Sequence, residues 1–197
     1  MRAVSHASQS SAACHDLLAV IDDILDLARI EANQIMLHES DVMLDEEMPV
    51  CARLAASHYG RPAHAVTVNL PDMLPPLHAD ARLIRQVLIN LIGNALKFSP
   101  TGMTVEVGAR LDAQRNEISL WVQDHGIGIA PQDQARIFDP FEQADTQLSR
   151  NYGGVGLGLS LVRAFVQAHQ GRIGIDSAPG KGTRITATFP AERTGTP

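Results

Sequence analysis

The chain has 197 residues, a formal net charge of −6 and an apolar content of 45%. This length suits one to one and a half domains with a substantial core. The acidic balance argues against nucleic-acid binding, and the absence of an apolar run near the ~20 residues of a membrane span predicts a segment without membrane contact. Two isolated cysteines, Cys14 and Cys51, predict neither a disulfide framework nor a zinc site.

The first part of the chain predicts one helix that needs a partner. Apolar residues recur at spacings of three and four from about residue 12 to 32, at Cys14, Leu17, Leu18, Ile21, Ile24, Leu25 and Ala28. A helix with a seam of about two heptads is not stable alone in water. We therefore expect it to pack on a second helix, on the body of the domain or on a second copy of the chain.

The rest of the chain predicts helices and strands that do not alternate one by one. Helices are expected at 45–59, 80–98, 132–138 and 156–169, and strands at 64–70, 103–111, 117–124, 172–176 and 184–189. Asp80 is the expected N-cap of the second of these helices. This order favours an α+β fold, a two-layer α/β sandwich with a mixed sheet and helices on one face. Residues 142–154 are expected to form a mobile loop, and 192–197 a disordered tail.

The helix expected at 80–98 carries an apolar stripe and, beside it, Asn90, Asn94 and Lys97. These three share one face, because offsets of three and four close a helical turn. Asn is a poor helix former, and a merely solvated face favours Glu, Lys or Arg. We interpret the set as ligands, with amide oxygens for a hard cation such as Mg²⁺ and an ammonium for phosphate. A solvated polar face is the alternative.

Three glycine stretches follow this helix. Residues 124–128 (DHGIG) come directly after an alternating apolar strand and present one carboxylate where the backbone permits close approach, although an ordinary turn after a strand would also explain them. Residues 153–158 (GGVGLG) open a helix, whose free N–H groups suit phosphate, although a flexible hinge would also explain them. Residues 180–183 (GKGT) precede a strand and alone indicate an ordinary turn.

In this order the motifs resemble the ATP-binding domain of sensor histidine kinases. That domain has the Bergerat fold, which type II topoisomerases, mismatch-repair ATPases and heat-shock chaperones share. The motifs are NxxxNAxKF from Asn90, DxGxG from Asp124, FDPF from Phe138, GVGLGL from Gly154, and Gly182-Thr183. Residues 23–32 also resemble the end of the second helix of the kinase dimerisation hairpin. The resemblance implies an ATP-binding catalytic domain over 41–191, preceded over 1–40 by the second hairpin helix alone.

The resemblance implies ATP and Mg²⁺ as cofactors and a role for each matching residue. Asn94 would ligate Mg²⁺, and Asp124 would accept a hydrogen bond from the adenine 6-amino group, helped by water and Thr183. Lys97 and Arg150 would meet phosphate. The implied ATP-binding set is Asn90, Asn94, Lys97, Phe98, Asp124, Gly126, Gly128, Arg150, Gly154, Gly156, Leu157, Gly158 and Thr183. Within this set, Gly126 and Gly128 would let the base approach the backbone. Gly154, Gly156 and Gly158 would form the hinge of a lid over the phosphates. Residues 138–141 would contact both the lid and the hairpin and hold them in place.

The sequence departs from the family where a phosphoacceptor is expected. His6 does not stand in the context of an acceptor histidine, and the first hairpin helix is not found. His15-Asp16 superficially resembles the acceptor pair of another kinase subfamily, but the register of the second hairpin helix disfavours this role. His125 replaces the usual Asn or Thr after the adenine aspartate, and Val155 stands where Thr is common. We therefore expect a kinase catalytic domain that does not phosphorylate itself alone. Its γ-phosphoryl would go to a histidine in the rest of the same protein or in another chain, with a response regulator downstream.

Two alternatives to phosphoryl transfer remain. The first is a module that binds ATP and partners and transfers nothing. The second is a hydrolytic ATPase, which is disfavoured because the family's hydrolytic members place a Glu four residues before the Mg²⁺ ligand, where this chain has Asn90. A neutral amide cannot act as a general base. The resemblance also implies a cytoplasmic location. It is equally compatible with the cytoplasmic part of a membrane-anchored sensor, and with a homodimer formed through the N-terminal helix.

Overall fold

The computed structural model describes residues 21, 24–30, 32, 36–142 and 155–195. The chain divides into two compact units, residues 1–35 and 36–197, whereas the sequence suggested a boundary after residue 40. In the first unit, residues 24–30 are helical as expected. Three seam residues of this helix, Ile21, Ile24 and Leu25, are 44 to 50% exposed. Most of the expected N-terminal helix lies outside the described residues.

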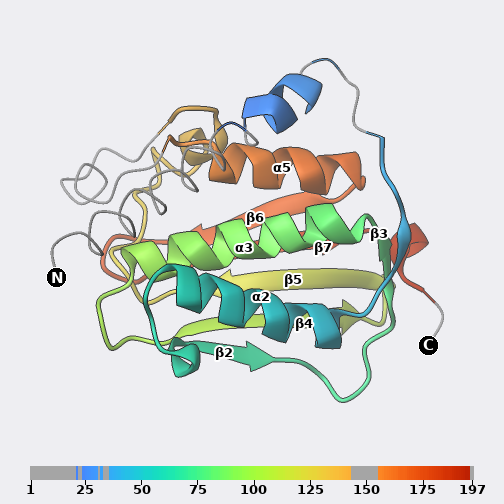
Figure 1. The fold of residues 1–197 in the computed structure, drawn as a ribbon, viewed down its shortest axis with the longest axis horizontal. Helices are drawn as coiled ribbons and strands as arrows, with labels where there is room; N and C mark the ends of the chain where they lie inside the picture. Colours follow the sequence, from blue (N-terminus) through green and yellow to red (C-terminus); the bar gives the residue numbers. More distant parts are fainter. Residues whose placement is uncertain (1–20, 22–23, 31, 33–35, 143–154, 196–197) are drawn as a thin grey trace, which may run out of the picture. The chain divides into compact units, whose positions relative to one another are not determined.

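The second unit contains a five-stranded mixed sheet with helices across one face (Figure 1). The strand order is β2-β4-β5-β7-β6, with β2 at Val66–Asn69, β4 at Val105–Asp112, β5 at Glu117–Gln123, β6 at Arg172–Ser177 and β7 at Thr183–Phe189. The helices are α2 (Leu44–His58), α3 (Ala81–Phe98) and α5 (Gly158–Ala168). β2 pairs parallel with β4, and the other described neighbours in this sheet are antiparallel. These observations confirm the predicted α+β two-layer sandwich.

Strand alternation determines which face of the sheet the helices cover. Val107 pairs with Val122, and Val122 pairs with Ile185, so one face carries a continuous apolar row across β4, β5 and β7. All three residues are buried. α3 packs between α2 and α5 (Figure 1) and buries its apolar stripe against this row. The core thus holds α3, the helix that carries the predicted Asn/Lys face.

The N-terminus of α3 is fixed by a buried network. Asp80 caps the helix as predicted, because its Oδ1 accepts from the N–H groups of Arg82 (3.0 Å) and Leu83 (3.3 Å). The N–H of Asp80 donates to Nε2 of His169 at 3.0 Å. That nitrogen must therefore be unprotonated, so Nδ1 carries the proton and donates to the Phe165 carbonyl at 2.7 Å. The network ties the start of α3 to the end of α5.

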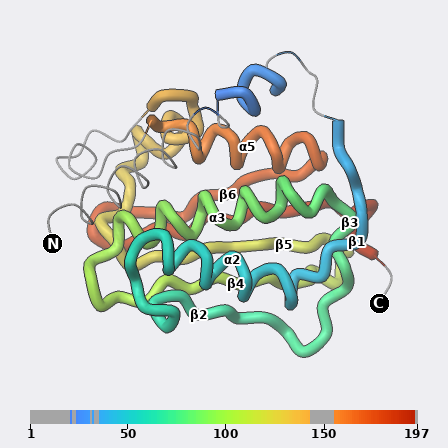
Figure 2. Tube along the Cα trace, in the orientation of Figure 1, coloured from blue at the N-terminus to red at the C-terminus, as the bar shows by residue number. Residues whose placement is uncertain are grey.

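A second, two-stranded sheet was not predicted. β1 (Ser40–Val42) pairs antiparallel with β3 (Leu77–Ala79), and Figure 2 shows the two strands side by side. The prolines at 71, 75 and 76 made the region before residue 80 appear to be a loop. Three residues are too few to show a strand period.

The prediction of a disordered tail from residue 192 is wrong as far as Gly195. Ala191–Arg193 forms a short 3-10 helix, and Thr194 forms a β-bridge with Leu77. Arg193 is buried, donates to the His78 carbonyl at 3.0 Å and pairs with Glu39 at 2.7 Å. A buried guanidinium with a carboxylate partner holds this segment in place.

The helix expected at 132–138 is also shorter than predicted. Only Arg136–Phe138 forms a helix, of the 3-10 type, after a series of turns. Ile137 and Phe138 are both buried although they are adjacent in sequence. Runs of 3-10 helix are usually short, and this single turn is enough to place both side chains in the core. In the described part of the chain, no helix is long and apolar enough to cross a membrane.

His169 should make the stability of the domain depend on pH. Burial is the main cause that lowers its pKa. The unfolded chain then takes up the proton first, so stability is full above the unfolded pKa of about 6.5 and is lost as pH falls below it. We expect His169→Gln to lower the free energy of unfolding at pH 7.5 by about 1–3 kcal/mol, because the buried hydrogen bond from the Asp80 N–H to the residue at position 169 is weakened. The difference from the wild type should shrink at pH 5.5.

Urea denaturation at the two pH values measures this difference. His64→Gln is the matched control, because His64 is exposed. An equal loss of stability at both pH values for His169→Gln would contradict the assignment of the neutral tautomer.

Candidate functional site

The C-terminal half of α3 carries the predicted cation and phosphate ligands. Asn90, Asn94, Lys97 and Phe98 are all half-buried, so this face is neither core nor freely solvated. Burial lowers the pKa of Lys97, and its Nζ lies 5.1 Å from the centroid of the Phe98 ring. The arrangement is compatible with the interpretation of this face as a ligand site, because a solvated face would leave these side chains exposed.

Asp124 lies at the end of β5 and is almost completely buried, with 8% of its surface exposed. Its Oδ1 accepts hydrogen bonds from the N–H of Gly126 (2.7 Å) and the N–H of Thr183 (3.2 Å). Burial raises its pKa, and these two N–H donors act in the opposite direction. Among the described residues, no hydrogen bond reaches Oδ2. One carboxylate oxygen is thus fixed by the backbone, and the other can accept from a ligand.

Three glycines allow this region to pack tightly. A Cβ on Gly126 would overlap the Phe98 carbonyl, one on Gly128 would overlap the Ala178 carbonyl, and one on Gly182 would overlap the Asp124 carbonyl. The glycines therefore bring together the end of α3, residues 124–128 and the turn between β6 and β7. The structure gives Gly126 and Gly128 a packing role inside the protein. Close approach of a base to them stays a prediction.

The segment before α5 forms a second part of the candidate site. α5 begins at Gly158, two residues later than predicted. Gly156 has φ of +78°, and its carbonyl accepts from the N–H of Phe141 at 3.1 Å. The side-chain amide of Asn90 donates to the Gly158 carbonyl at 3.4 Å, which links α3 to the first residue of α5. Arg150 and Gly154 lie outside the described residues.

Leu157 is only 2% exposed, so its side chain packs in the core. Its part in ATP binding stays a prediction. Its carbonyl accepts from the N–H of Leu161 at 3.0 Å and from Oγ of Ser160 at 2.7 Å.

The donor set at the polar face of α3 fits a cation that arrives with a nucleotide. Asn94 offers one amide oxygen, and in the part of the chain that the structure describes no three His, Cys, Asp or Glu side chains are placed to hold a metal. Mg²⁺ commonly uses one or two protein oxygens and completes its shell with phosphate oxygens and water. These residues therefore fit Mg²⁺ on a bound nucleotide better than an ion held by protein alone.

Two residues that sequence reasoning missed hold this region together. Oγ of Ser177 lies within hydrogen-bond distance of the Ile129 nitrogen (2.8 Å), the Gly182 carbonyl (2.9 Å) and Oγ1 of Thr183 (2.9 Å). Nε2 of Gln134 donates to the carbonyls of Ile129 (3.2 Å) and Ser177 (2.8 Å). Neither residue belongs to a glycine motif, and each contacts partners that its sequence context does not indicate.

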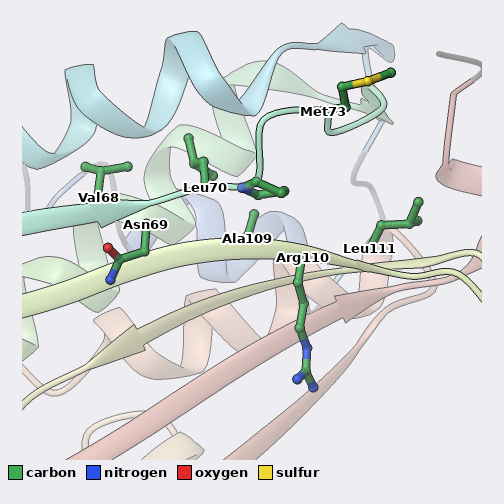
Figure 3. Close-up of a pocket in the computed structure, with 8 residues that line it drawn as sticks. Val68, Asn69, Leu70, Met73, Ala109, Arg110 and Leu111 are labelled. Carbon is green, nitrogen blue, oxygen red and sulfur yellow. The ribbon is translucent and has the colours of Figure 1, made fainter.

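A separate hollow lies at the β2 edge of the sheet. It has a volume of about 560 Å³ and is lined by Val68, Asn69, Leu70, Pro71, Met73, Ala109, Arg110 and Leu111. Figure 3 shows Arg110 and Leu111 pointing to opposite sides of β4. None of the predicted ligand residues lines this hollow, so it is not the candidate nucleotide site.

Comparison with known proteins identifies the class of the domain. The family model described as histidine kinase-, DNA gyrase B-, and HSP90-like ATPase matches residues 79–193, and the chain belongs to this family. The match includes α3, β4 to β7, and every predicted ligand residue. Within this family, the chain is the ATP-binding catalytic domain found in two-component histidine kinases.

Individual relatives support the narrower assignment. The chain is 38% identical over 176 residues to the non-motile and phage-resistance protein of Caulobacter vibrioides, covering 88% of this chain and 21% of that protein. It is 37% identical over 179 residues to the circadian input-output histidine kinase CikA of Thermosynechococcus vestitus, covering 89% and 24%. The crystal structure of full-length ShkA in complex with AMPPNP matches with a TM-score of 0.75 and 30% identity, over 89% of this chain and 36% of that chain. This chain thus spans about a fifth to a quarter of the two curated relatives.

The packing role of Gly128 can be separated from its backbone conformation. Gly128 and Gly180 have similar positive φ values, +67° and +74°, but a Cβ on Gly180 would meet nothing within 4 Å. We expect Gly180→Ala to cost only the left-handed conformation, about 1–2 kcal/mol. Gly128→Ala should cost about 1–3 kcal/mol more, because backbone must move to admit the methyl group. Chemical denaturation of the two variants measures the difference, and equal losses would show that Gly128 is not needed for packing.

Proposed function

We propose that this domain binds MgATP and donates the γ-phosphoryl group to a histidine on a dimerisation hairpin, as the catalytic part of a sensor histidine kinase. The observation that carries the proposal is Asp124. It is a buried carboxylate whose Oδ1 is held by two backbone N–H groups, while no described residue bonds Oδ2. A buried acceptor of this kind suits the amino group of adenine. The family match supports the same assignment.

In this proposal, the remaining site residues extend along α3 from the base to the phosphates. Phe98 lies nearest the Asp124 end, because the Phe98 carbonyl contacts Gly126. Lys97 would meet phosphate, and the amide oxygen of Asn94 would hold Mg²⁺, which supplies charge neutralisation at the phosphates when bound. Asn90, Gly156 and Gly158 would line the phosphate end, together with Arg150 and Gly154. Such a site works mainly by positioning, so the nucleophile can come from another segment or chain.

The chemistry of Asn90 favours transfer over hydrolysis. Its side-chain nitrogen donates to the Gly158 carbonyl, and an amide cannot take a proton from water. We propose that the acceptor histidine belongs to a hairpin elsewhere in the same protein or in another chain, with a response regulator downstream. The domain alone should then not phosphorylate itself.

Asp124→Asn tests the adenine contact. Asn can place its oxygen where Oδ1 now accepts from Gly126 and Thr183, which puts an NH₂ group in the position of Oδ2. Two donors would then face each other, so the Kd for ATP should rise about tenfold or more, as expected for about 1–3 kcal/mol. The melting temperature should not fall, because a buried charge is removed.

Isothermal titration calorimetry measures the ATP affinity of this variant. Asp176→Asn provides the control, since Asp176 is an exposed aspartate on β6. Unchanged ATP affinity in Asp124→Asn would refute the adenine assignment.

Incubation with γ-labelled ATP tests the reaction. With Mg²⁺ and a separately produced hairpin that bears an acceptor histidine, we expect acid-labile label on the hairpin and none on this chain. Asn94→Ala should abolish the dependence of ATP affinity on Mg²⁺. Asn69→Ala, at an exposed position on β2, should leave that dependence unchanged. Release of inorganic phosphate without transfer would indicate an ATPase. ATP binding with neither outcome would indicate a docking module, and label on His6 or His15 would place the acceptor in this chain.

A further inference from the structure

Ser177 lies where β6 ends, at the junction of the three backbone segments around Asp124. It is half-buried, and its hydroxyl has three polar neighbours at 2.8 to 2.9 Å: the Ile129 nitrogen, the Gly182 carbonyl and Oγ1 of Thr183. A serine hydroxyl has one proton and two lone pairs. All three contacts are therefore hydrogen bonds only if the protons are distributed in one way.

The chemistry of the neighbours determines this distribution. The Ile129 N–H can only donate, so it uses one lone pair of Ser177 Oγ. The Gly182 carbonyl can only accept, so it takes the Ser177 proton. Thr183 must then donate its own hydroxyl proton to the second lone pair of Ser177. If Ser177 donated to Thr183 instead, its proton could not also bind the Gly182 carbonyl, and Gly182 is buried.

This distribution determines what Thr183 can offer to a ligand. With its proton used by Ser177, Oγ1 of Thr183 presents only lone pairs to other groups. Thr183 is also bound through its N–H to Oδ1 of Asp124, which leaves Oδ2 as the other acceptor nearby. Oδ2 of Asp124 and Oγ1 of Thr183 can therefore both accept a hydrogen bond from a ligand, and neither can donate one.

We propose that Ser177 is a specificity-determining positioning residue, which makes the base-binding end of the site an acceptor surface by taking up the hydroxyl proton of Thr183. This inference rests on the nucleotide-binding function proposed above. An exocyclic amino group on the base brings two N–H donors to this surface, either directly or through a water molecule. A 6-oxo group brings an acceptor, which would leave buried polar groups unpaired, and such mismatches give strong discrimination.

A purely structural role for Ser177 makes a different prediction. Ser177 also connects Ile129 to Gly182, so its loss would loosen the site for every nucleotide equally. The acceptor-surface role predicts instead that the ratio of affinities for amino and oxo bases changes. ATP and inosine triphosphate (ITP) are suitable probes, because ITP carries a 6-oxo group where ATP carries the 6-amino group.

The experiment measures the Kd values of ATP and ITP by calorimetry for the full chain. The wild type should prefer ATP, and Ser177→Ala should narrow the Kd ratio about tenfold, since the Thr183 hydroxyl becomes free to donate. The matched control is Ser119→Ala, which removes the same kind of Ser–Thr bond (Ser119 to Thr188, 3.0 Å) within the same sheet. It should leave the ratio unchanged, and Ser177→Thr, which keeps a hydroxyl, should preserve it.

A double-mutant cycle shows whether Ser177 acts through Thr183. Thr183→Val removes the hydroxyl but keeps the backbone N–H, so it should narrow the ratio, and adding Ser177→Ala should narrow it no further. Equal weakening of both nucleotides by Ser177→Ala, or independent effects of the two substitutions, would overturn the inference. If Ser177→Ala does not fold, an unchanged ratio in Thr183→Val overturns it as well. A wild type that binds neither nucleotide would instead refute the proposed function, and this inference with it.

Discussion

The architecture of the candidate site depends on one contact, the pair of hydrogen bonds that Oδ1 of Asp124 accepts from Gly126 and Thr183. The bond from Thr183 joins the end of β5 to the start of β7, and the bond from Gly126 fixes the turn that follows β5. They are possible only because Gly126 and Gly182 lack a Cβ, which would overlap neighbouring carbonyls. A buried carboxylate is costly unless its oxygens are bonded, and here the backbone bonds one oxygen before any ligand arrives. The remaining acceptor is therefore held in place in advance, which reduces the cost of ordering on binding.

The other end of the site is held by α3, whose two ends are fixed independently. At the N-terminus, Asp80 caps the helix and donates its own N–H to His169. At the C-terminus, the Phe98 carbonyl lies against Gly126. The 18 residues of α3 span about 27 Å, so the polar face between these anchors cannot shift without disturbing one of them. This rigidity suits a reaction that depends on positioning more than on acid–base groups.

The sequence was informative where the signals are local. The alternating strands, the apolar stripe of α3 and the Asp80 cap are properties of neighbouring residues, and the structure confirms each. The DxGxG motif drew attention to Asp124, but only its order among the other motifs indicated a nucleotide site, because such a turn is common after a strand. Packing could not be predicted in the same way. The Ser177–Ile129 bond joins residues 48 apart and the Arg193–His78 bond joins residues 115 apart, and no pattern in the sequence relates them.

The glycines show most clearly what a motif alone does not reveal. In a sequence, Gly126 and Gly128 indicate only that backbone must come close to something, and a bound base is one candidate. In the structure, that something is the protein itself, the end of α3 and the turn after β6. The two explanations are compatible, because a base could lie close to the backbone that these contacts hold in place. The same glycines can therefore be required for folding and for binding, and a substitution that moves the backbone would affect ATP affinity through the position of Asp124 even without touching the ligand.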